Sequence, residues 1–303
     1  MKQLGDILSD IKDEDLRERL ESLGRAIEND PRSDETSQSS QRQPAKIIQL
    51  PLWPEAKRGV PNSILRGALF AAIQGKTRTA MKREVLMSQQ GIEIRFTGWK
   101  LDQSDLDVFE QAVHLARQHP LGTRCHFTGY GFLKSLGRPT GGDHHEWLKD
   151  ALARLTSATV EITHRQFSYF GPLVYEGTRD ESDDQHRYVL EINPKIMALY
   201  SAGWTAVDWE TRQKLRRKPL ALWLHGFYSS HAAPHPLKVE TIHRLCGSRN
   251  KDIGGFKRDL GNAFKQLVKA EAIKHFEFKD ELVFVDNIPS ISQQRHLDRP
   301  KDG

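Results

Sequence analysis

The stretch that decides the fold is residues 237–285, LKVETIHRLCGSRNKDIGGFKRDLGNAFKQLVKAEAIKHFEFKDELVFV. It predicts a short amphipathic helix over residues 239–246, which Gly247 and Ser248 end. A longer helix follows from about residue 252 to 272, because apolar residues recur there at three-and-four spacing and form its core side: Ile253, Phe256, Leu260, Phe264, Leu267 and Val268. Two short strands around a polar turn then predict a hairpin. Short helix, turn, long helix and hairpin is the order of a winged helix-turn-helix.

The long helix has a second face, which is basic. Between Arg249 and Lys274 there are seven Lys or Arg and three Asp or Glu, a local net charge of 7 − 3 = +4. Such a helix can lie in a major groove, where cations neutralise phosphates and Asn or Arg reads base edges. The alternative is a solvated face on an ordinary core helix, but the helix-turn-helix order favours DNA. The candidate DNA-binding residues here are Arg249, Asn250, Lys251, Arg258, Asn262, Lys265, Lys269 and, on the hairpin turn, Lys279.

Composition indicates a soluble protein of two domains with a nucleic-acid partner. The chain has 303 residues, a net charge of +5 and 37% hydrophobic residues, with no apolar run of membrane length, so we expect it in the cytoplasm. Residues 1–30 carry five basic and nine acidic side chains, net −4, which leaves +5 − (−4) = +9 for the rest. A basic body of this kind suits a polyanion. Cys125 and Cys246 form no CxxC pair, so neither a zinc ribbon nor a disulfide framework is expected.

Five segments follow from composition and periodicity. Residues 1–28 predict an acidic amphipathic helical arm, and residues 29–58 a disordered linker rich in Ser, Gln and Pro. Residues 59–193 and 194–287 predict two winged-helix domains, and residues 288–303 a disordered tail. Within the second domain, residues 210–231 predict the first helix, with a kink at Pro219. The fold class expected is therefore α+β, with two tandem winged helix-turn-helix domains.

The first of these domains repeats the element order of the second. It predicts a helix that Asp105 caps, a short helix over 129–136, a turn, and a long helix from Asp143. Strands at 159–163 and 187–192 follow, with 167–175 as a possible third strand. The solvent face of its long helix is mixed in charge, so we expect the weaker DNA reader. Its candidate contacts are Arg138, Thr140, Lys149 and, in the expected wing, Arg165.

An apolar peptide, KIIQLPLWP at residues 46–54, lies in polar surroundings. Its residues Gln49, Leu50, Leu52 and Trp53 resemble the short Gln-Leu-x-Leu-aromatic peptide by which replication proteins dock on the sliding clamp. There the apolar side chains would fill a hydrophobic pocket, and the Gln would hydrogen-bond at its rim. The alternative is a strap that packs on the first domain.

The sequence motifs of two enzyme classes, NTPases and rolling-circle nickases, are incomplete in this chain. A phosphate-binding loop ending at Gly75-Lys76-Thr77 would need a glycine where Phe70 stands. It would also need a preceding strand, whereas residues 64–73 predict a helix. His144 and His145 lack the His-hydrophobic-His spacing of a rolling-circle nickase. We therefore expect no catalysis, cofactor or metal.

Several segments together resemble the TrfA family of broad-host-range plasmid replication initiators. They are FYSSH at 227–231, PLKVET at 236–241, LCGS at 245–248, the strand at 91–98 and the helix at 151–158. The resemblance implies binding to direct repeats (iterons) at a plasmid origin, origin opening, and recruitment of the host replicative helicase and sliding clamp. It also implies a homodimer in equilibrium with monomer, which serves copy control. From the residues alone, a winged-helix transcriptional regulator is the alternative.

Overall fold

The structure is a computed structural model that describes residues 50–75, 78–89, 91–118, 123–164, 167–180, 182 and 187–298. The predicted arm and most of the predicted linker lie outside these ranges. Buried apolar side chains form two clusters, one from Leu50 to Trp209 and one from Leu215 to Val283. We call residues 50–209 the first lobe and residues 215–287 the second lobe.

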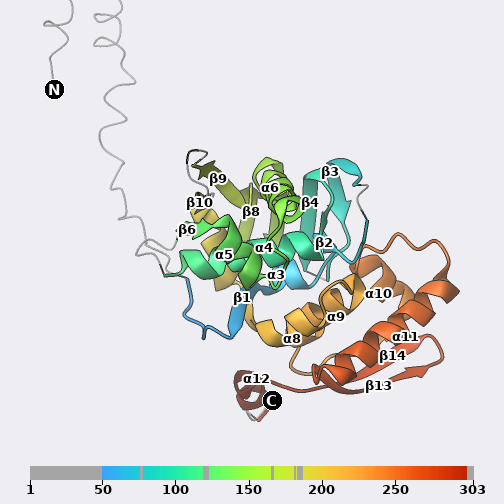
Figure 1. Ribbon diagram of the computed structural model, residues 1–303. Helices are drawn as coiled ribbons and strands as arrows, with labels where there is room; N and C mark the ends of the chain where they lie inside the picture. The colour runs from blue at the N-terminus through green and yellow to red at the C-terminus, as the bar shows by residue number, and fades with distance from the viewer. Residues whose placement is uncertain are drawn as a thin grey trace, which may run out of the picture. The chain divides into compact units, whose positions relative to one another are not determined.

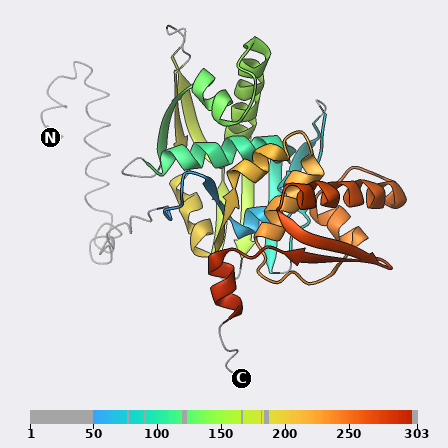
Figure 2. The same cartoon turned by 60° about the horizontal axis from the view of Figure 1, so that its bottom comes forward.

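The second lobe contains the elements that the deciding stretch predicted. Its order is α9 (Pro219–Ser229), β12 (Leu237–Lys238), α10 (Val239–Leu245), α11 (Ile253–Lys269), β13 (Ile273–Lys279) and β14 (Leu282–Asn287). The strands form one antiparallel sheet in the order β12-β14-β13. Helix α11 lies beside the β13–β14 hairpin (Figures 1 and 2), where Phe264 stacks on Phe276 with 5.0 Å between ring centroids.

The first lobe repeats this arrangement. Its order is α4 (Gln103–Ala116), β6 (Arg124–Thr128), α5 (Gly129–Ser135), α6 (Gly142–Ser157), β9 (Val174–Arg179) and β10 (Arg187–Ile192). The sheet order β6-β10-β9 matches β12-β14-β13 strand for strand. Gly137 and Gly247 stand at the same place after the short helix, with φ of 64° and 62°, a region that favours glycine.

An inserted hairpin corrects the wing expected in the first lobe. Strands β7 (Thr159–His164) and β8 (Phe167–Gly171) follow α6, but they join β3 (Ala80–Leu86) and β4 (Ile92–Trp99) in a separate sheet, β3-β4-β7-β8. Strands β7 and β8 therefore belong to that sheet, and Arg165 lies outside the described residues. Strands β9 and β10 take the place of the wing strands instead.

The first core extends past the boundary expected at 193/194. Strand β1 (Lys57–Pro61) pairs antiparallel with β11 (Trp204–Asp208). The helices η2 (Pro194–Ile196) and α7 (Met197–Ser201) contribute buried side chains to the first core. Residues 194–209 thus fold with the first lobe, not the second.

Other local predictions also need correction. The helix expected from Ile64 to Ile73 is the short α3 (Asn62–Leu65) followed by β2 (Phe70–Ala71), which pairs with β5 (Leu101–Asp102). The kinked helix expected over 210–231 is two helices, α8 (Trp209–Lys214) and α9, because Pro219 starts a helix rather than bending one.

Three predicted ends and caps differ as well. Asp102 rather than Asp105 caps α4, and Asp105 completes a capping box with it. Part of the expected tail forms α12 (Ile291–Leu297), with its own capping box at Ser290. Residues 50–58 of the expected linker are ordered, and two of them enter the first core.

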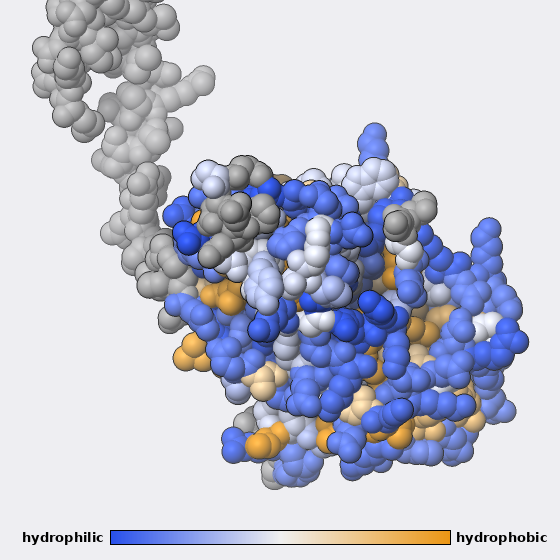
Figure 3. All heavy atoms as spheres, viewed as in Figure 1, coloured by the Kyte–Doolittle hydropathy of each residue, from blue (hydrophilic) through white to orange (hydrophobic). Residues whose placement is uncertain are grey.

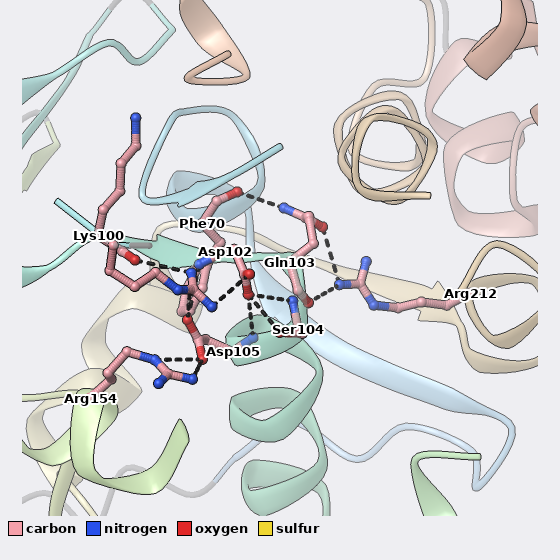
Figure 4. A network of polar contacts seen from close by, with 9 residues as sticks. Phe70, Lys100, Asp102, Gln103, Ser104, Asp105, Arg154 and Arg212 are labelled. Carbon is pink, nitrogen blue, oxygen red and sulfur yellow. Dashed lines mark hydrogen bonds and ion pairs between the residues drawn. The ribbon is translucent and has the colours of Figure 1, made fainter. Parts of the chain in front are cut away.

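A buried arginine joins α8 to α4. Arg212 is 1% exposed, and its guanidinium lies 2.5 Å from Asp107 and 3.3 Å from Glu110. It also donates to the backbone and side-chain oxygens of Gln103 (Figure 4). Burial raises the pKa of Glu110 to about 7, against the opposing charge of Arg212. Removing Arg212 would leave the carboxyl groups of Asp107 and Glu110 without the cation that pairs with both, so this contact fixes α8 on α4.

A second ionic cluster lies beside it at the start of α4. Arg78 pairs with Asp102 at 2.7 Å, and Arg154 of α6 pairs with the fully buried Asp105 at 2.8 Å (Figure 4). Burial raises the pKa of Asp105, and the two arginines oppose that effect. The cluster ties α6 and the β2–β3 segment to the same end of α4.

Candidate nucleic-acid interface

Helix α11 separates a buried apolar side from an exposed basic strip. Phe256, Leu260, Ala263, Phe264 and Leu267 are buried. On the opposite side, Arg258, Asn262, Lys265 and Lys269 are exposed, as the sequence predicted. Ile253 and Val268, expected in the core, are 43% and 38% exposed because they lie at the margins of the apolar side. We call Gly254, Arg258, Gly261, Asn262, Lys265 and Lys269 the basic strip.

Two glycines interrupt the basic strip. A Cβ at Gly261 would meet only Phe278, at 3.7 Å, and a Cβ at Gly254 only the Asp252 carboxylate, at 3.3 Å. A glycine inside a helix costs about 1 kcal/mol relative to alanine. Space for a methyl group therefore exists at Gly261, so packing within the protein does not require that glycine.

The start of α11 is fixed by its cap and by the preceding turn. The carboxylate of Asp252 accepts hydrogen bonds from the backbone N–H groups of Gly254 and Gly255, both at 2.9 Å. The side-chain oxygen of Asn250 accepts from Asp252 N at 3.0 Å, and its amide donates to Asp259. Asn250 thus holds the turn together, whereas Lys251 beside it is exposed.

The turn before α11 also contacts the first lobe. The backbone N–H of Ala72 donates to Cys246 O at 2.7 Å, and Lys100 Nζ donates to Gly247 O at 3.1 Å. Arg249, a predicted DNA contact, donates from Nη2 to Thr79 Oγ1 at 3.0 Å. Residues of the first lobe therefore contact the turn that precedes α11, and these contacts join positions too far apart in the sequence for a local pattern to predict them.

The wing of the second lobe carries the predicted Lys279. Its ammonium lies 3.0 Å from Glu277 and 5.3 Å from the ring centre of Phe284. Lys257 of α11 donates to the backbone oxygen of Asp280 at the tip. The hairpin turn is thus tied to α11, with Lys279 exposed beside it.

A groove of about 440 Å³ lies between α11 and the connection from α8 to α9. Its lining includes Asn262 from the basic strip and Arg217 and Lys218 from the connection between α8 and α9. Lys218 Nζ donates to Gln266 Oε1 at 2.6 Å. Arg217 has φ of 65°, a strained value for a residue with a side chain. This connection therefore places Arg217 and Lys218 next to the basic strip, although neither residue was predicted to contact DNA.

The corresponding helix of the first lobe, α6, is unlike α11. Asp143, Glu146 and Asp150 are exposed along it, and Lys149 forms an ion pair with Glu146 at 2.6 Å. These carboxylates would repel phosphates, so α6 is the poorer candidate for a groove-reading helix.

The predicted contacts in the turn before α6 are partly engaged within the protein. Arg138 lies 3.4 Å above the ring centre of Trp147, and burial lowers its pKa. Thr140 is half-buried in the same turn. Together with α6 and the α8–α9 connection, Arg138 lines a cavity of about 820 Å³.

In Figure 3, hydrophilic residues dominate the visible face and apolar residues form scattered patches.

The peptide predicted to dock on a clamp is built into the first lobe. Trp53 is 5% exposed, donates from Nε1 to His114 Nδ1 at 3.0 Å, and stacks on Tyr200. Leu50 is also buried, and Leu52 is 85% exposed. Gln49 lies outside the described residues. The peptide therefore packs on the first lobe as a strap, which was the alternative prediction. In this arrangement the buried Leu50 and Trp53 are not accessible to a clamp.

Groups that would support catalysis or metal binding are scarce in the described residues. No three His, Cys, Asp or Glu side chains there gather as metal ligands. Burial raises the pKa of Cys125 and Cys246 to about 12, so both thiols stay protonated near neutral pH. Burial lowers the pKa of His225 to about 3, which makes it a neutral core side chain. No helix in the described part of the chain is long and apolar enough to cross a membrane.

A family model described as TrfA protein matches residues 32–287. The chain belongs to the TrfA family. It is similar to the plasmid replication initiator protein TrfA of Escherichia coli, with 26% identity over 255 residues. That match covers 82% of this chain and 66% of the relative, so the chain spans slightly less than two thirds of the relative's length.

Solved structures of another protein share the mixed α+β fold of this TrfA family member. A crystal structure of domains 2 and 3 of RctB, from selenomethionine derivatives, matches with a TM-score of 0.53 and 11% identity, over 75% of this chain and 98% of that one. A further structure of RctB domains 2–3 gives a TM-score of 0.50 and 13% identity, over 78% and 99%. At such identities the likeness concerns the fold alone.

Proposed function

We propose that this protein is a plasmid replication initiator that binds direct repeats at a plasmid origin through two winged helix-turn-helix units. The observation that carries the proposal is the basic strip of α11, exposed along one side of a helix that a buried core and a capped turn hold in place. Membership of the TrfA family and the likeness to an initiator from Escherichia coli support it.

In this proposal α11 enters the major groove of one repeat. Arg258 and Asn262 read base edges, while Lys265 and Lys269 neutralise phosphates. Lys279 on the hairpin turn contacts the backbone beside the groove. The first lobe makes mainly backbone contacts, because the carboxylates of α6 oppose a second groove-reading helix.

Origin opening would follow from binding energy and needs no catalytic step in this chain. Several copies bound to adjacent repeats bend the DNA, and the deformation costs least in a flexible AT-rich segment. Host helicase and sliding clamp are the proposed partners, and a monomer–dimer equilibrium the proposed control of copy number, all by analogy with the family. Clamp docking through Leu50 and Trp53 requires the strap to leave the first lobe, whereas Leu52 is already exposed.

The test is a binding titration on repeats from the cognate origin, with random duplex as competitor and salt varied. We expect a preference of roughly a thousandfold or more that persists as salt rises. Arg258→Ala or Asn262→Ala should weaken repeat binding by about 10- to 100-fold and random-duplex binding far less. Lys195→Ala, an exposed cation on η2, serves as the matched control. Equal losses on both duplexes would remove the base-reading role.

A winged-helix transcriptional regulator is the second candidate, since the same strip would serve an operator. The two functions separate in cells that carry a plasmid with the cognate origin and no other initiator gene. An initiator maintains that plasmid, and Arg258→Ala abolishes maintenance. Repeat binding without maintenance would favour the regulator.

A further inference from the structure

Two cations from different lobes meet at the turn before α11. Lys100 follows β4 in the first lobe, and Arg249 lies in the turn of the second lobe, three residues before the Asp252 cap. Lys100 Nζ donates to Gly247 O, and Arg249 donates to Thr79 of the first lobe. Segments far apart in the sequence thus bring a lysine and an arginine to one place.

Close packing at Gly247 makes this meeting possible. A Cβ at Gly247 would lie 3.0 Å from the Ala71 methyl group and 3.5 Å from Lys100 Nζ. Its φ of 62° adds strain for any other residue. The first lobe therefore approaches the turn as closely as a glycine permits, and Lys100 points away from the ionic cluster at α4, toward the turn (Figure 4).

The environment of Lys100 is unfavourable for a cation in the absence of an anion. Burial lowers the pKa of Lys100, and the neighbouring charge of Arg249 lowers it further. The charge of Glu84 raises this pKa, but its effect is smaller than that of Arg249. Its ammonium has three N–H donors, of which the carbonyl of Gly247 uses one. An arriving anion would relieve the repulsion and use the remaining donors.

The position of the pair indicates which anion this is. Arg249 lies three residues before the Asp252 cap of α11, and Lys100 contacts the same turn through Gly247 O. In helix-turn-helix proteins a backbone phosphate lies at the edge of the groove that the recognition helix enters. The exposed Lys251 lies in the same turn and faces solvent.

We propose that Lys100 and Arg249 together bind one backbone phosphate of the duplex that α11 enters. The site rests on the proposed function, and it gives the first lobe a direct, sequence-independent part in anchoring the recognition helix. Arg258 and Asn262 would then choose the sequence, while this pair sets the depth and register of α11 in the groove.

The test compares salt dependence for the full chain and the variants Lys100→Gln, Arg249→Gln and the double variant. Each single change should weaken binding about tenfold on repeat and random duplex alike, and lower the slope of log K against log salt by about 0.9. The double variant should lose less than the sum of the two, because both contact one phosphate. Ethylation of that phosphate should interfere with binding of the wild type, less with either single variant, and not with the double variant.

Two further variants separate binding from structure. Thr79→Val removes the tether of Arg249 without changing charge, so the salt slope should stay as in the wild type. Lys57→Gln is the matched control, because Lys57 on β1 pairs with Asp208. It should change neither the DNA affinity nor the salt slope. Thermal unfolding of every variant shows whether the fold persists.

The outcomes distinguish this site from the proposed function. If Lys100→Gln and Arg249→Gln lower stability and leave the salt slope unchanged, the pair is structural and the inference is wrong. If the wild type shows no preference for the repeats, the proposed function fails, yet a lower slope on random duplex would still support the phosphate site. If repeat preference is present and the slope stays constant, the inference alone is overturned.

Discussion

Replacing Trp53 with alanine should destabilise the protein strongly. The side chain is 5% exposed, and a buried tryptophan removes roughly 200 Å² from water, worth about 5 kcal/mol at about 25 cal/mol per Å². The change also leaves His114 Nδ1 without the donor that Trp53 Nε1 supplies at 3.0 Å. The residues around Trp53 can fill only part of the cavity that the smaller side chain leaves. We therefore expect a loss of about 3–5 kcal/mol in the free energy of unfolding.

Urea unfolding of the full chain, followed by circular dichroism, measures this loss. Leu52→Ala is the matched control, because that side chain is 85% exposed and its removal should change stability by less than about 0.5 kcal/mol. Equal stability of Trp53→Ala and the wild type would refute the strap and leave the segment free for a partner.

Gly59→Ala tests the same contact without altering the peptide. A Cβ at Gly59 would lie 2.4 Å from the Trp53 ring, so the alanine must displace the strap. We expect a similar loss of stability and, if the clamp peptide is real, stronger retention on immobilised sliding clamp than the wild type. Loss of stability with unchanged retention would count against clamp docking by Trp53.

Three other predictions concern α11 and the buried charges. Gly261→Ala should raise the free energy of unfolding by up to about 1 kcal/mol and weaken repeat binding, because the methyl group fits the protein but lies on the basic strip. Urea unfolding and the repeat titration measure the two effects. Tighter repeat binding would exclude a close approach of DNA at Gly261. Arg212→Ala should cost about 3–5 kcal/mol, since it leaves Asp107 and Glu110 buried without a counter-charge; a loss below about 1 kcal/mol would contradict the joint between α8 and α4. Burial raises the pKa of Glu110 from 4.5 to about 7, so the folded protein keeps a proton that the unfolded chain releases, and this group lowers stability as pH rises through that window. Glu110→Gln should therefore gain stability relative to the wild type between pH 5 and pH 8, by up to about 3 kcal/mol, and a pH-independent difference would contradict the buried carboxyl.

The sequence predicted α11 well because an amphipathic helix carries its own signal. Apolar spacing and the opposing cations identified both faces, and only Ile253 and Val268 at the margins differed. The repeated element order was visible for the same reason. These features depend on neighbours within a few residues.

Features that depend on distant partners were missed or misread. The β7–β8 hairpin resembled a wing, because its pairing with β4 involves residues that local alternation cannot identify. Trp53 resembled a docking residue, since its burial depends on Tyr200 and Trp204 much later in the chain. The contact of Lys100 with Gly247 spans 147 positions and has no local signal at all.

The contacts of Arg212 limit how such proteins can be recombined. Its carboxylate partners lie in α4, and its own helix leads into the second lobe. A chimera that exchanges α8 and the second lobe for those of a relative keeps its two lobes aligned only if the arginine and the carboxylates are exchanged together. Under the proposed function, repeat specificity should therefore diversify within a lineage by substitutions along α11, while the contacts of Arg212 stay fixed.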